Sequence, residues 1–286
     1  MPMELVRALP YDHPYRWDGT PVGGVNLWRP LNLLVPASVW LDAEDTTTIT
    51  LNGATVSQWN DKSGNARNVS QATAADQPTY SATGLNGKPI LTFDGSDLLS
   101  NTAPGALLRN VPGATLAAVV NYTNNTAGRA VCSVATASAG QTRSALLVNN
   151  TTATGYLVGG RRLDANSFQI SGSTTFSAAT TVLQFGVLDY ANSDAFSYVN
   201  GTLEATNTAF QTSGNTSDTN SAALYVGASA TGGTNPLIGS VAEIVIVPAA
   251  LSADQRQRLE GYFAWKWALE ASLPVGHPYK NTPPTV

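Results

Sequence analysis

The fold is decided by the stretch Thr55–Asp97, which contains Val56-Ser-Gln-Trp-Asn-Asp-Lys-Ser-Gly-Asn65, Pro78-Thr-Tyr80 and Gly84-Leu-Asn-Gly-Lys-Pro-Ile-Leu-Thr-Phe-Asp-Gly95. Short runs of β-branched and aromatic residues alternate there with polar ones, which is typical of half-buried strands. Asn, Asp, Gly and Pro interrupt each run, and these residues favour turns for distinct backbone reasons. The stretch therefore predicts a sheet whose strands fold back on one another.

Similar short runs continue on both sides of this stretch. The expected strands are Val39–Leu41, Thr48–Leu51, Val56–Trp59, Pro89–Phe93, Thr115–Tyr122, Ala130–Val134, Ala145–Val148, Gly155–Val158, Thr181–Tyr190, Ala195–Val199, Ala222–Gly227 and Ile238–Val247. Asn200-Gly201 predicts a two-residue hairpin. Because parallel pairing needs long crossovers and almost no helix separates these runs, we expect an all-β, antiparallel two-sheet sandwich.

One helix is predicted, over residues 252–269. Ser252-Ala-Asp-Gln255 fits a capping box, and Pro274 stops further propagation. The apolar residues that recur at helical spacing on one face are Leu259, Tyr262, Phe263 and Trp267. Trp265 projects away from that face, so it either packs at the margin of the helix contact or anchors a partner.

Residues 1–36 are expected to form an extended N-terminal arm. They contain several prolines and a Gly23-Gly24 pair, and they follow neither the strand nor the helix period. The arm nevertheless carries large aromatic residues, among them Tyr11, Tyr15, Trp17 and Trp28. Because exposing such rings to water is unfavourable, we expect the arm to lie against its own body or a neighbouring subunit.

Residues 274–286 contain four prolines and are expected to form an extended C-terminal tail. The tail includes His277-Pro-Tyr-Lys280, which echoes His13-Pro-Tyr-Arg16 in the arm. The echo arises by chance or because both extensions lie on equivalent surfaces.

Composition indicates a globular chain with one core, residues 37–273, and two extensions. Of 286 residues, 43% are hydrophobic and 12% charged, against a usual charged share of about 25%. A net charge of −4, with Arg161-Arg162 the only adjacent basic pair, disfavours binding of nucleic acid.

A single cysteine, Cys132, excludes an intrachain disulfide and is expected to be a buried thiol. We expect neither a signal peptide nor a membrane helix, because no apolar run approaches the length of about 18 residues that a span needs.

Two widely separated blocks resemble a known family. They are Trp40-Leu-Asp-Ala43 with the opening stretch, and Gly239-Ser-Val-Ala-Glu-Ile-Val-Ile-Val247 with the helix ending Trp265-Lys-Trp267. Together they resemble the laminin G-like branch of the concanavalin A-like lectin/glucanase superfamily, over Val39–Leu273. The resemblance implies a jelly roll in which Val39–Leu41 lies beside Val241–Val247 and the helix covers one edge. Such domains look like those of tailed phages and bacterial surface proteins.

Catalytic motifs are scarce. Superfamily members that cleave glycans carry Glu-x-Asp-x-x-Glu, because retaining hydrolysis needs two carboxylates about 5–5.5 Å apart. This chain lacks that spacing, and Glu243 is followed by Ile-Val-Ile-Val. Glu243 is thus either a structural charge near the helix or the acid of a divergent glycosidase. With no Gly-x-Ser-x-Gly motif either, we expect no enzyme.

Ligand motifs are few. Asp94 and Asp97 flank a turn that resembles the family's Asp-rich turn, so they either bind Ca²⁺ or bond turn amides; no other cofactor is expected. Trp59 with Asn60 and Asp61 is either core or a sugar platform. Polar loops at 124–128 and 212–220 are better placed for glycans, but their composition names no contacts, so glycan-binding residues stay unassigned.

We therefore predict a non-enzymatic structural protein of a phage particle, namely a capsid decoration or cement subunit on the virion surface. Its partners would be the major capsid or other virion proteins and further copies of itself. The partner interface would use Tyr11, Tyr15, Trp17, Trp28 and Trp265, and deleting residues 1–36 should leave a folded sandwich that no longer assembles. The alternative is a carbohydrate-binding module of a phage fibre or bacterial surface protein, which acts outside the cell or on its surface.

Overall fold

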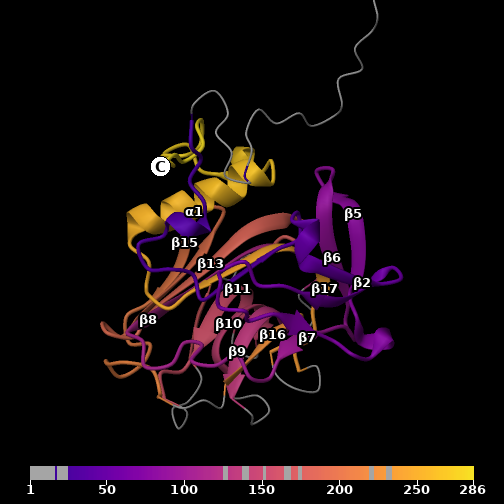
Figure 1. Cartoon of the computed structure of the whole chain (residues 1–286). Coiled ribbons are helices and arrows are strands. Elements are labelled where there is room, and N and C mark those ends of the chain that lie inside the picture. Colours follow the sequence, from indigo (N-terminus) through magenta and orange to yellow (C-terminus); the bar gives the residue numbers. More distant parts are fainter. Residues whose placement is uncertain are drawn as a thin grey trace, which may run out of the picture.

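Strand β8 (Gly113–Tyr122) lies at the centre of the first of two layers in a computed structural model of the chain (Figure 1). The structure describes residue 17 and residues 25–124, 128–136, 142–150, 153–163, 169–172, 176–218, 222–229 and 234–286. On one side of β8 follow β13 (Thr181–Asp189), β14 (Asp194–Val199) and β15 (Thr202–Asn207). On its other side lies β17 (Ile238–Val247), whose far edge pairs with β6 (Lys88–Asp94) and β1 (Val39–Asp42), and β5 (Thr79–Leu85) pairs with β6.

The second layer is built in the same antiparallel way. Its strands follow the order β4 (Val69–Ser70), β7 (Leu99–Asn101), β16 (Ala222–Val226), β9 (Arg129–Thr136), β10 (Thr142–Asn150), β11 (Ala153–Gly160) and β12 (Gln169–Gly172). Strands β2 (Ile49–Asn52) and β3 (Thr55–Trp59) form a hairpin that joins the two layers through β4 and β5. The predicted two-sheet jelly roll is confirmed.

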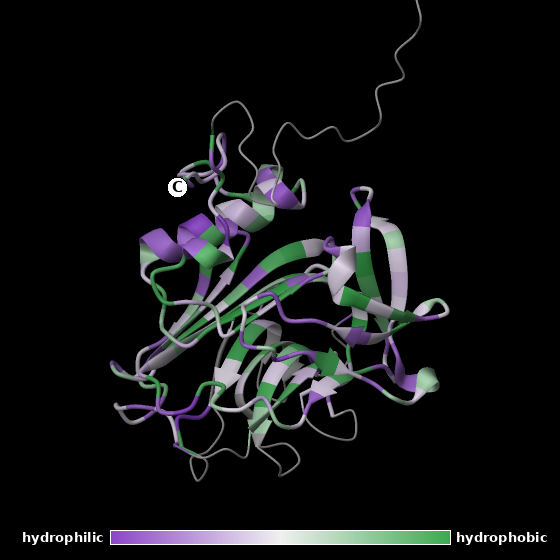
Figure 2. Cartoon of the chain, viewed as in Figure 1, coloured by the Kyte–Doolittle hydropathy of each residue, from purple (hydrophilic) through white to green (hydrophobic). Residues whose placement is uncertain are grey.

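The core lies between the layers. Strands β11 and β12 of the second layer pack on β13, β14 and β15 of the first. Figure 2 shows hydrophobic residues along the strands of both layers and hydrophilic ones in many of the loops. Two polar bonds also cross the interface: Gln184 Nε2 donates to the Leu157 carbonyl (3.0 Å), and Ser197 Oγ donates to the Tyr156 carbonyl (3.0 Å). These two buried polar side chains are thus satisfied by carbonyls of the facing layer.

Helix α1 (Ala253–Lys266) covers the outer face of the first layer (Figure 1). Its N-cap is Ser252, whose hydroxyl accepts the Gln255 N–H at 3.4 Å, as predicted. The helix is shorter than the predicted 252–269, because Ala268 adopts a left-handed backbone (φ 53°) and Leu269 N–H returns to the Ala264 carbonyl. Among the described residues, no helix is long and apolar enough to cross a membrane.

Residues 25–36 and the tail meet beside α1. Leu27 and Thr285 form an antiparallel bridge, Trp28 N–H donates to the Pro284 carbonyl and Val286 N–H to the Asn26 carbonyl (both 3.0 Å). The tail is not simply extended as expected, because turns form where His277 N–H bonds the Pro274 carbonyl and Lys280 N–H bonds His277. The two ends of the described chain therefore stabilise one another.

Several short strands escaped the sequence pattern. Strands β4, β7 and β12 span only two to four residues. Runs of this length carry no measurable period, and pairing with neighbours alone defines them. Strands β4 and β7 are short, but they join the β2–β3 hairpin to the second layer.

Candidate functional site

Asp42 and Glu243 lie directly opposite each other on the antiparallel strands β1 and β17. Opposed residues of such a pair project from the same face of a sheet. The register therefore creates a pair of carboxylates that is invisible in the sequence, where the two residues are 201 positions apart. Two neighbouring carboxylates are what glycoside hydrolysis requires, so this pair is the first candidate for a catalytic site.

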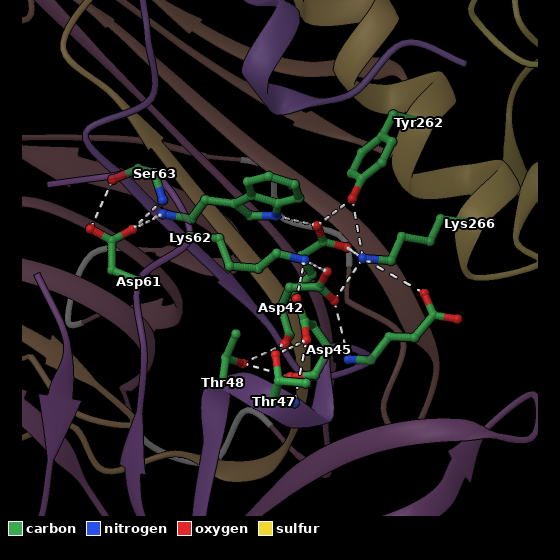
Figure 3. Close-up of polar contacts among 12 residues, drawn as sticks. Asp42, Asp45, Thr47, Thr48, Asp61, Lys62, Ser63, Tyr262 and Lys266 are labelled. Atoms are coloured by element: carbon green, nitrogen blue, oxygen red, sulfur yellow. Dashed lines mark hydrogen bonds and ion pairs between the residues drawn. The ribbon is translucent and has the colours of Figure 1, made fainter. Parts of the chain in front are cut away.

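The Glu243 carboxylate accepts four hydrogen bonds. Oε1 accepts from Trp40 Nε1 (2.6 Å) and the Tyr262 hydroxyl (2.8 Å). Oε2 accepts from Lys266 Nζ (2.8 Å) and Trp267 Nε1 (2.7 Å). Figure 3 shows Tyr262 and Lys266 reaching from α1 toward the polar cluster that includes Asp42. Because both oxygens are fully occupied, none of the carboxylate's hydrogen-bonding capacity remains for a substrate.

Asp42 is held between two lysines. Its Oδ1 lies 2.6 Å from Lys266 Nζ and its Oδ2 lies 2.8 Å from Lys62 Nζ. Lys62 also pairs with Asp45 at 2.9 Å and lies over the Trp40 ring, 4.4 Å from its centroid. The network continues to the surface where Glu44 pairs with Lys88. Lysines thus alternate with carboxylates from the buried centre to the rim.

These contacts set the charges. Burial alone would lower the pKa of Lys266, but the charges of Asp42 and Glu243 raise it on balance. Burial alone would raise the pKa of Asp42, but Lys266 and Lys62 lower it on balance. Burial raises the pKa of Glu243, and Lys266 opposes that rise. Since the two indoles and the ammonium around Glu243 can only donate, the geometry holds its carboxylate in the ionised form.

The carboxylate pair is therefore built for structure. Glu243 has no exposed surface and the Asp42 residue only 3%, because side chains of α1 and Lys62 pack against them. A general acid must carry a proton to a substrate oxygen within hydrogen-bond reach. Here the Lys266 ammonium holds both carboxylates in the ionised form, so they carry no proton to give. Their burial also keeps a substrate oxygen out of hydrogen-bond reach. The network instead joins β1, β17 and α1, which are far apart in sequence.

The Trp-Asn-Asp-Lys-Ser-Gly-Asn segment is a loop organised around Asp61. Oδ1 of Asp61 accepts the backbone N–H groups of Trp40 and Ser63 (both 2.9 Å). Oδ2 accepts from Ser63 Oγ (2.8 Å) and the Arg67 N–H (3.0 Å). The loop thereby fixes β1 and brings Lys62 to Asp42 (Figure 3). The residues that carried the family resemblance are thus largely those that build this network.

The sequence prediction missed Asp42, Lys266 and the indoles of Trp40 and Trp267 as members of one cluster. One signal was available. Lys266 stands four residues after Tyr262, on the apolar face of the predicted helix. A lysine on such a face needs a buried carboxylate partner, and Glu243 is an acid within a predicted strand.

The predicted calcium residues bond turn groups. Asp97 Oδ2 accepts the Asp94 N–H (2.9 Å), and Asp94 Oδ1 accepts the Ser96 N–H (2.8 Å) and hydroxyl (2.7 Å). Burial raises the pKa of Asp97 to about 6. In the described part of the chain, no three His, Cys, Asp or Glu side chains gather as a metal site would require. This donor set fits the turn role better than that of a calcium cage.

Most of the aromatic residues predicted to bind a sugar or a partner contact other parts of their own chain. Trp59 is fully buried, which leaves its ring inaccessible to a sugar, and Trp28 is 3% exposed, with its ring in the core cluster. Trp28 is thus not available to a partner, because its own chain covers it. Half-buried Trp265 donates to the Tyr279 carbonyl (2.8 Å), which places it under the tail.

The remaining predicted residues are Trp17, Tyr11, Tyr15 and Cys132. Trp17 packs edge-on against Tyr262, with ring centroids 5.1 Å apart. Tyr11 and Tyr15 lie outside the described residues. Cys132 is buried as expected, and burial raises the pKa of its thiol to about 12, so it is not a reactive nucleophile.

A family model described as the concanavalin A-like lectin/glucanases superfamily matches residues 93–255. Among solved structures, domain 4 of AbnA, an extracellular GH43 arabinanase of Geobacillus stearothermophilus in complex with arabinotriose, is 13% identical; the match covers 79% of this chain and 98% of that chain, with a TM-score of 0.53. The CBM40 of the Ruminococcus gnavus IT-sialidase, bound to α2,3 sialyllactose, is 21% identical over 51% of this chain and 80% of that chain, with a TM-score of 0.40. Only the first of these two scores supports a shared fold. No curated protein sequence matches this chain.

Proposed function

Because this chain belongs to the concanavalin A-like lectin/glucanases superfamily, we propose that it is a non-catalytic carbohydrate-binding module that attaches the protein or particle carrying it to a glycan. The observation that carries this proposal is the match to an arabinanase domain solved with arabinotriose, which extends over 79% of the chain. That structure is one domain of an arabinanase in complex with arabinotriose, an oligosaccharide.

The carboxylate network supports the non-catalytic part of the proposal. Asp42 and Glu243 are the one pair of facing acids on β1 and β17, and both lie beneath α1. Lys266 pairs with both carboxylates and Lys62 with Asp42, which keeps the pair ionised, so neither group can deliver a proton to a glycosidic oxygen. Sugar binding would therefore use the loops and strand faces away from this network.

The test is a glycan array probed with the full chain, followed by calorimetry with arabinotriose and the best array ligands. We expect saturable binding to one class of glycan and no increase in reducing ends during long incubation. A silent array together with no calorimetric signal would refute the binding function. Release of reducing sugar would refute the non-catalytic part, and the variant Asp42→Asn would then show whether the buried pair is responsible.

The virion decoration role is the second candidate, and one observation favours it. Residues 25–36 expose apolar side chains on the surface of the described chain, with Leu34 84% and Leu31 55% exposed. Apolar side chains exposed together often mark contacts with another protein. The burial of Trp28 weighs against the role, because its own chain already covers this ring and leaves it unavailable to a virion partner.

Self-association separates the two candidates. Light scattering over a range of concentrations should show a monomer if the chain acts as a glycan-binding module alone. Concentration-dependent oligomers that the double variant Leu31→Ser/Leu34→Ser abolishes would favour a subunit that assembles through its arm. A variant with Leu51→Ser, which changes an exposed leucine on β2, is the matched control.

A further inference from the structure

Both histidines of the chain begin the same four-residue pattern, His-Pro-Tyr followed by a basic residue. One copy is His13-Pro-Tyr-Arg16 and the other is His277-Pro-Tyr-Lys280. The structure describes how the second copy is bound. We call its binding surface the tail seat, and define it by Glu260, Gly261, Trp265 and the carbonyls of Glu270–Leu273.

The histidine of the tail binds a buried carboxylate. His277 Nε2 lies 3.0 Å from Glu260 Oε2, and both side chains are buried. His277 Nδ1 accepts the Tyr279 N–H at 3.2 Å, so the proton of the neutral ring sits on Nε2 and is donated to Glu260. Arg256 pairs with the other oxygen of Glu260. Histidine is the side chain that can accept on one nitrogen and donate on the other in this way.

The tyrosine of the tail lies on a glycine of α1. A Cβ at Gly261 would come within 2.6 Å of Tyr279 Cβ, so the missing side chain makes room for the tyrosine. Trp265 Nε1 donates to the Tyr279 carbonyl at 2.8 Å. The seat thus recognises both the ring and the backbone at this position.

The basic residue closes the end of the helical segment. Lys280 Nζ donates to the carbonyls of Glu270 (3.1 Å), Ala271 (2.6 Å) and Leu273 (2.7 Å). These carbonyls surround the short helix η4 (Glu270–Ser272), and a cation is favourable at such an end. An arginine, with five N–H donors, can satisfy the same carbonyls. The three contacted side chains are therefore the three that recur at positions 13, 15 and 16.

The residue that follows the arm copy in the sequence lies next to this seat. Trp17, which directly follows Arg16, packs against Tyr262 with ring centroids 5.1 Å apart, and Tyr262 is the neighbour of Gly261 on α1. A ligand joined to its site by so short a link has a high effective concentration. We propose that the tail seat recognises His-Pro-Tyr-basic segments and that residues 13–16 of the same chain are its second occupant, in competition with the tail.

This competition makes the tail a releasable element and is independent of any glycan binding. When the arm occupies the seat, the tail loses Glu260 and the helix-end carbonyls. The bridge between Leu27 and Thr285 then loses the support of the seated tail. The seat thus couples the position of one end of the chain to that of the other.

Hydrogen exchange read by mass spectrometry tests the proposal on the full chain. The double variant His277→Ala/Lys280→Ala weakens the tail, so exchange in 277–286 should accelerate while exchange in 12–17 slows by about tenfold or more. The control also carries His13→Ala and Arg16→Ala, and there the 12–17 segment should show no slowing. Equal exchange of 12–17 in the two variants would overturn the proposal.

A second measurement keeps the test valid if those variants fold poorly. A synthetic peptide of residues 11–18 is added to the unmodified protein at millimolar concentration. We expect it to accelerate exchange of the tail amides, and a peptide with alanine for His13 and Arg16 to leave them unchanged. No acceleration with the unmodified peptide would likewise overturn the proposal.

Discussion

A carboxylate as deeply buried as Glu243 is costly unless its acceptor positions are filled. Here two tryptophans, a tyrosine and a lysine fill them, and Asp42 balances the charge of that lysine. Each member is therefore needed by the others, which explains why the cluster joins strands and helix so specifically. At the scale of the residue, the consequence is that small chemical changes should have large effects on stability.

Replacing Glu243 by glutamine should lower the free energy of unfolding by about 3–5 kcal/mol, because the amide would remove one of the two carboxylates that hold the buried Lys266 ammonium and would place an N–H against groups that can only donate. Urea denaturation followed by tryptophan fluorescence measures this. The control is Asp218→Asn, which removes an exposed ion-pair partner of Arg109 and should cost no more than about 1 kcal/mol. Similar losses for the two variants would contradict the structural role.

Asp97 should make stability depend on pH. Its pKa is raised by burial to about 6 in the folded chain, so the folded state holds the proton more tightly than the unfolded state, whose pKa is about 3.9. The free energy of unfolding that this group contributes should therefore fall as pH rises from about 4 to 6 and then level off. In Asp97→Asn this component should be absent. Identical pH profiles for variant and parent would show that Asp97 is not the group responsible.

The same variant tests the calcium prediction. If Asp94 and Asp97 bind Ca²⁺, adding the ion at neutral pH should raise the melting temperature of the parent and not that of Asp97→Asn. Because both carboxylates bond turn groups, we expect no calcium-dependent shift in either protein. A shift confined to the parent would restore the calcium site.

At the scale of the element, helix α1 is packed on two sides. Its inner face contacts the first layer, where Phe263 meets Phe185 with ring centroids 5.7 Å apart. Its outer side carries the tail, with Tyr279 on Gly261. The helix therefore lies between the tail and the sheet, and the two contact residues Gly261 and Phe263 are two positions apart on it.

Gly261→Ala separates helix propensity from packing. In an open helix position the change should stabilise by about 1 kcal/mol. Here the new Cβ would meet Tyr279 Cβ and Cγ, which cannot move without moving the tail, and overpacking of this kind costs about 1–3 kcal/mol. We expect a small net loss of stability and faster hydrogen exchange in residues 277–286. A more stable variant with an unchanged tail would contradict this contact.

At the scale of the whole molecule, part of the N-terminal arm belongs to the globular body. Trp28 and Leu33 join the core cluster, and the Leu34 N–H donates to Gln255 Oε1 at the start of α1 (3.1 Å). Burying these groups stabilises the fold by removing apolar area from water. Residues 25–36 of the arm thus serve their own chain.

Two deletions test how much residues 25–36 contribute to the stability of the fold. Removal of residues 1–24 should change the free energy of unfolding by no more than about 1–2 kcal/mol, chiefly through the Trp17 ring contact. Removal of residues 1–36 should cost considerably more, because losing Trp28 alone corresponds to about 3–5 kcal/mol. This revises the expectation that the longer deletion leaves the sandwich intact. Equal stability of the two truncated proteins, measured by urea denaturation, would restore it.

The sequence by itself determined the antiparallel sandwich, the single helix and the family, because alternation, turn residues and helix caps act over a few residues and leave a local pattern. Thus Ser252 caps α1 as predicted, and Val39–Leu41 pairs with β17 as the resemblance implied. The site was harder to predict from the sequence. Glu243 was recognised as a structural charge or an acid, but its partners were not.

Only the tertiary structure decided which of these roles applies. Asp42 meets Glu243 through the register of β1 on β17, and Trp28 meets the tail through the meeting of both ends beside α1. Such contacts join residues more than 200 positions apart, so they depend on strand register and on the path of the chain in space. A shift of one residue would turn Asp42 to the opposite face of the sheet, and no local pattern records that choice.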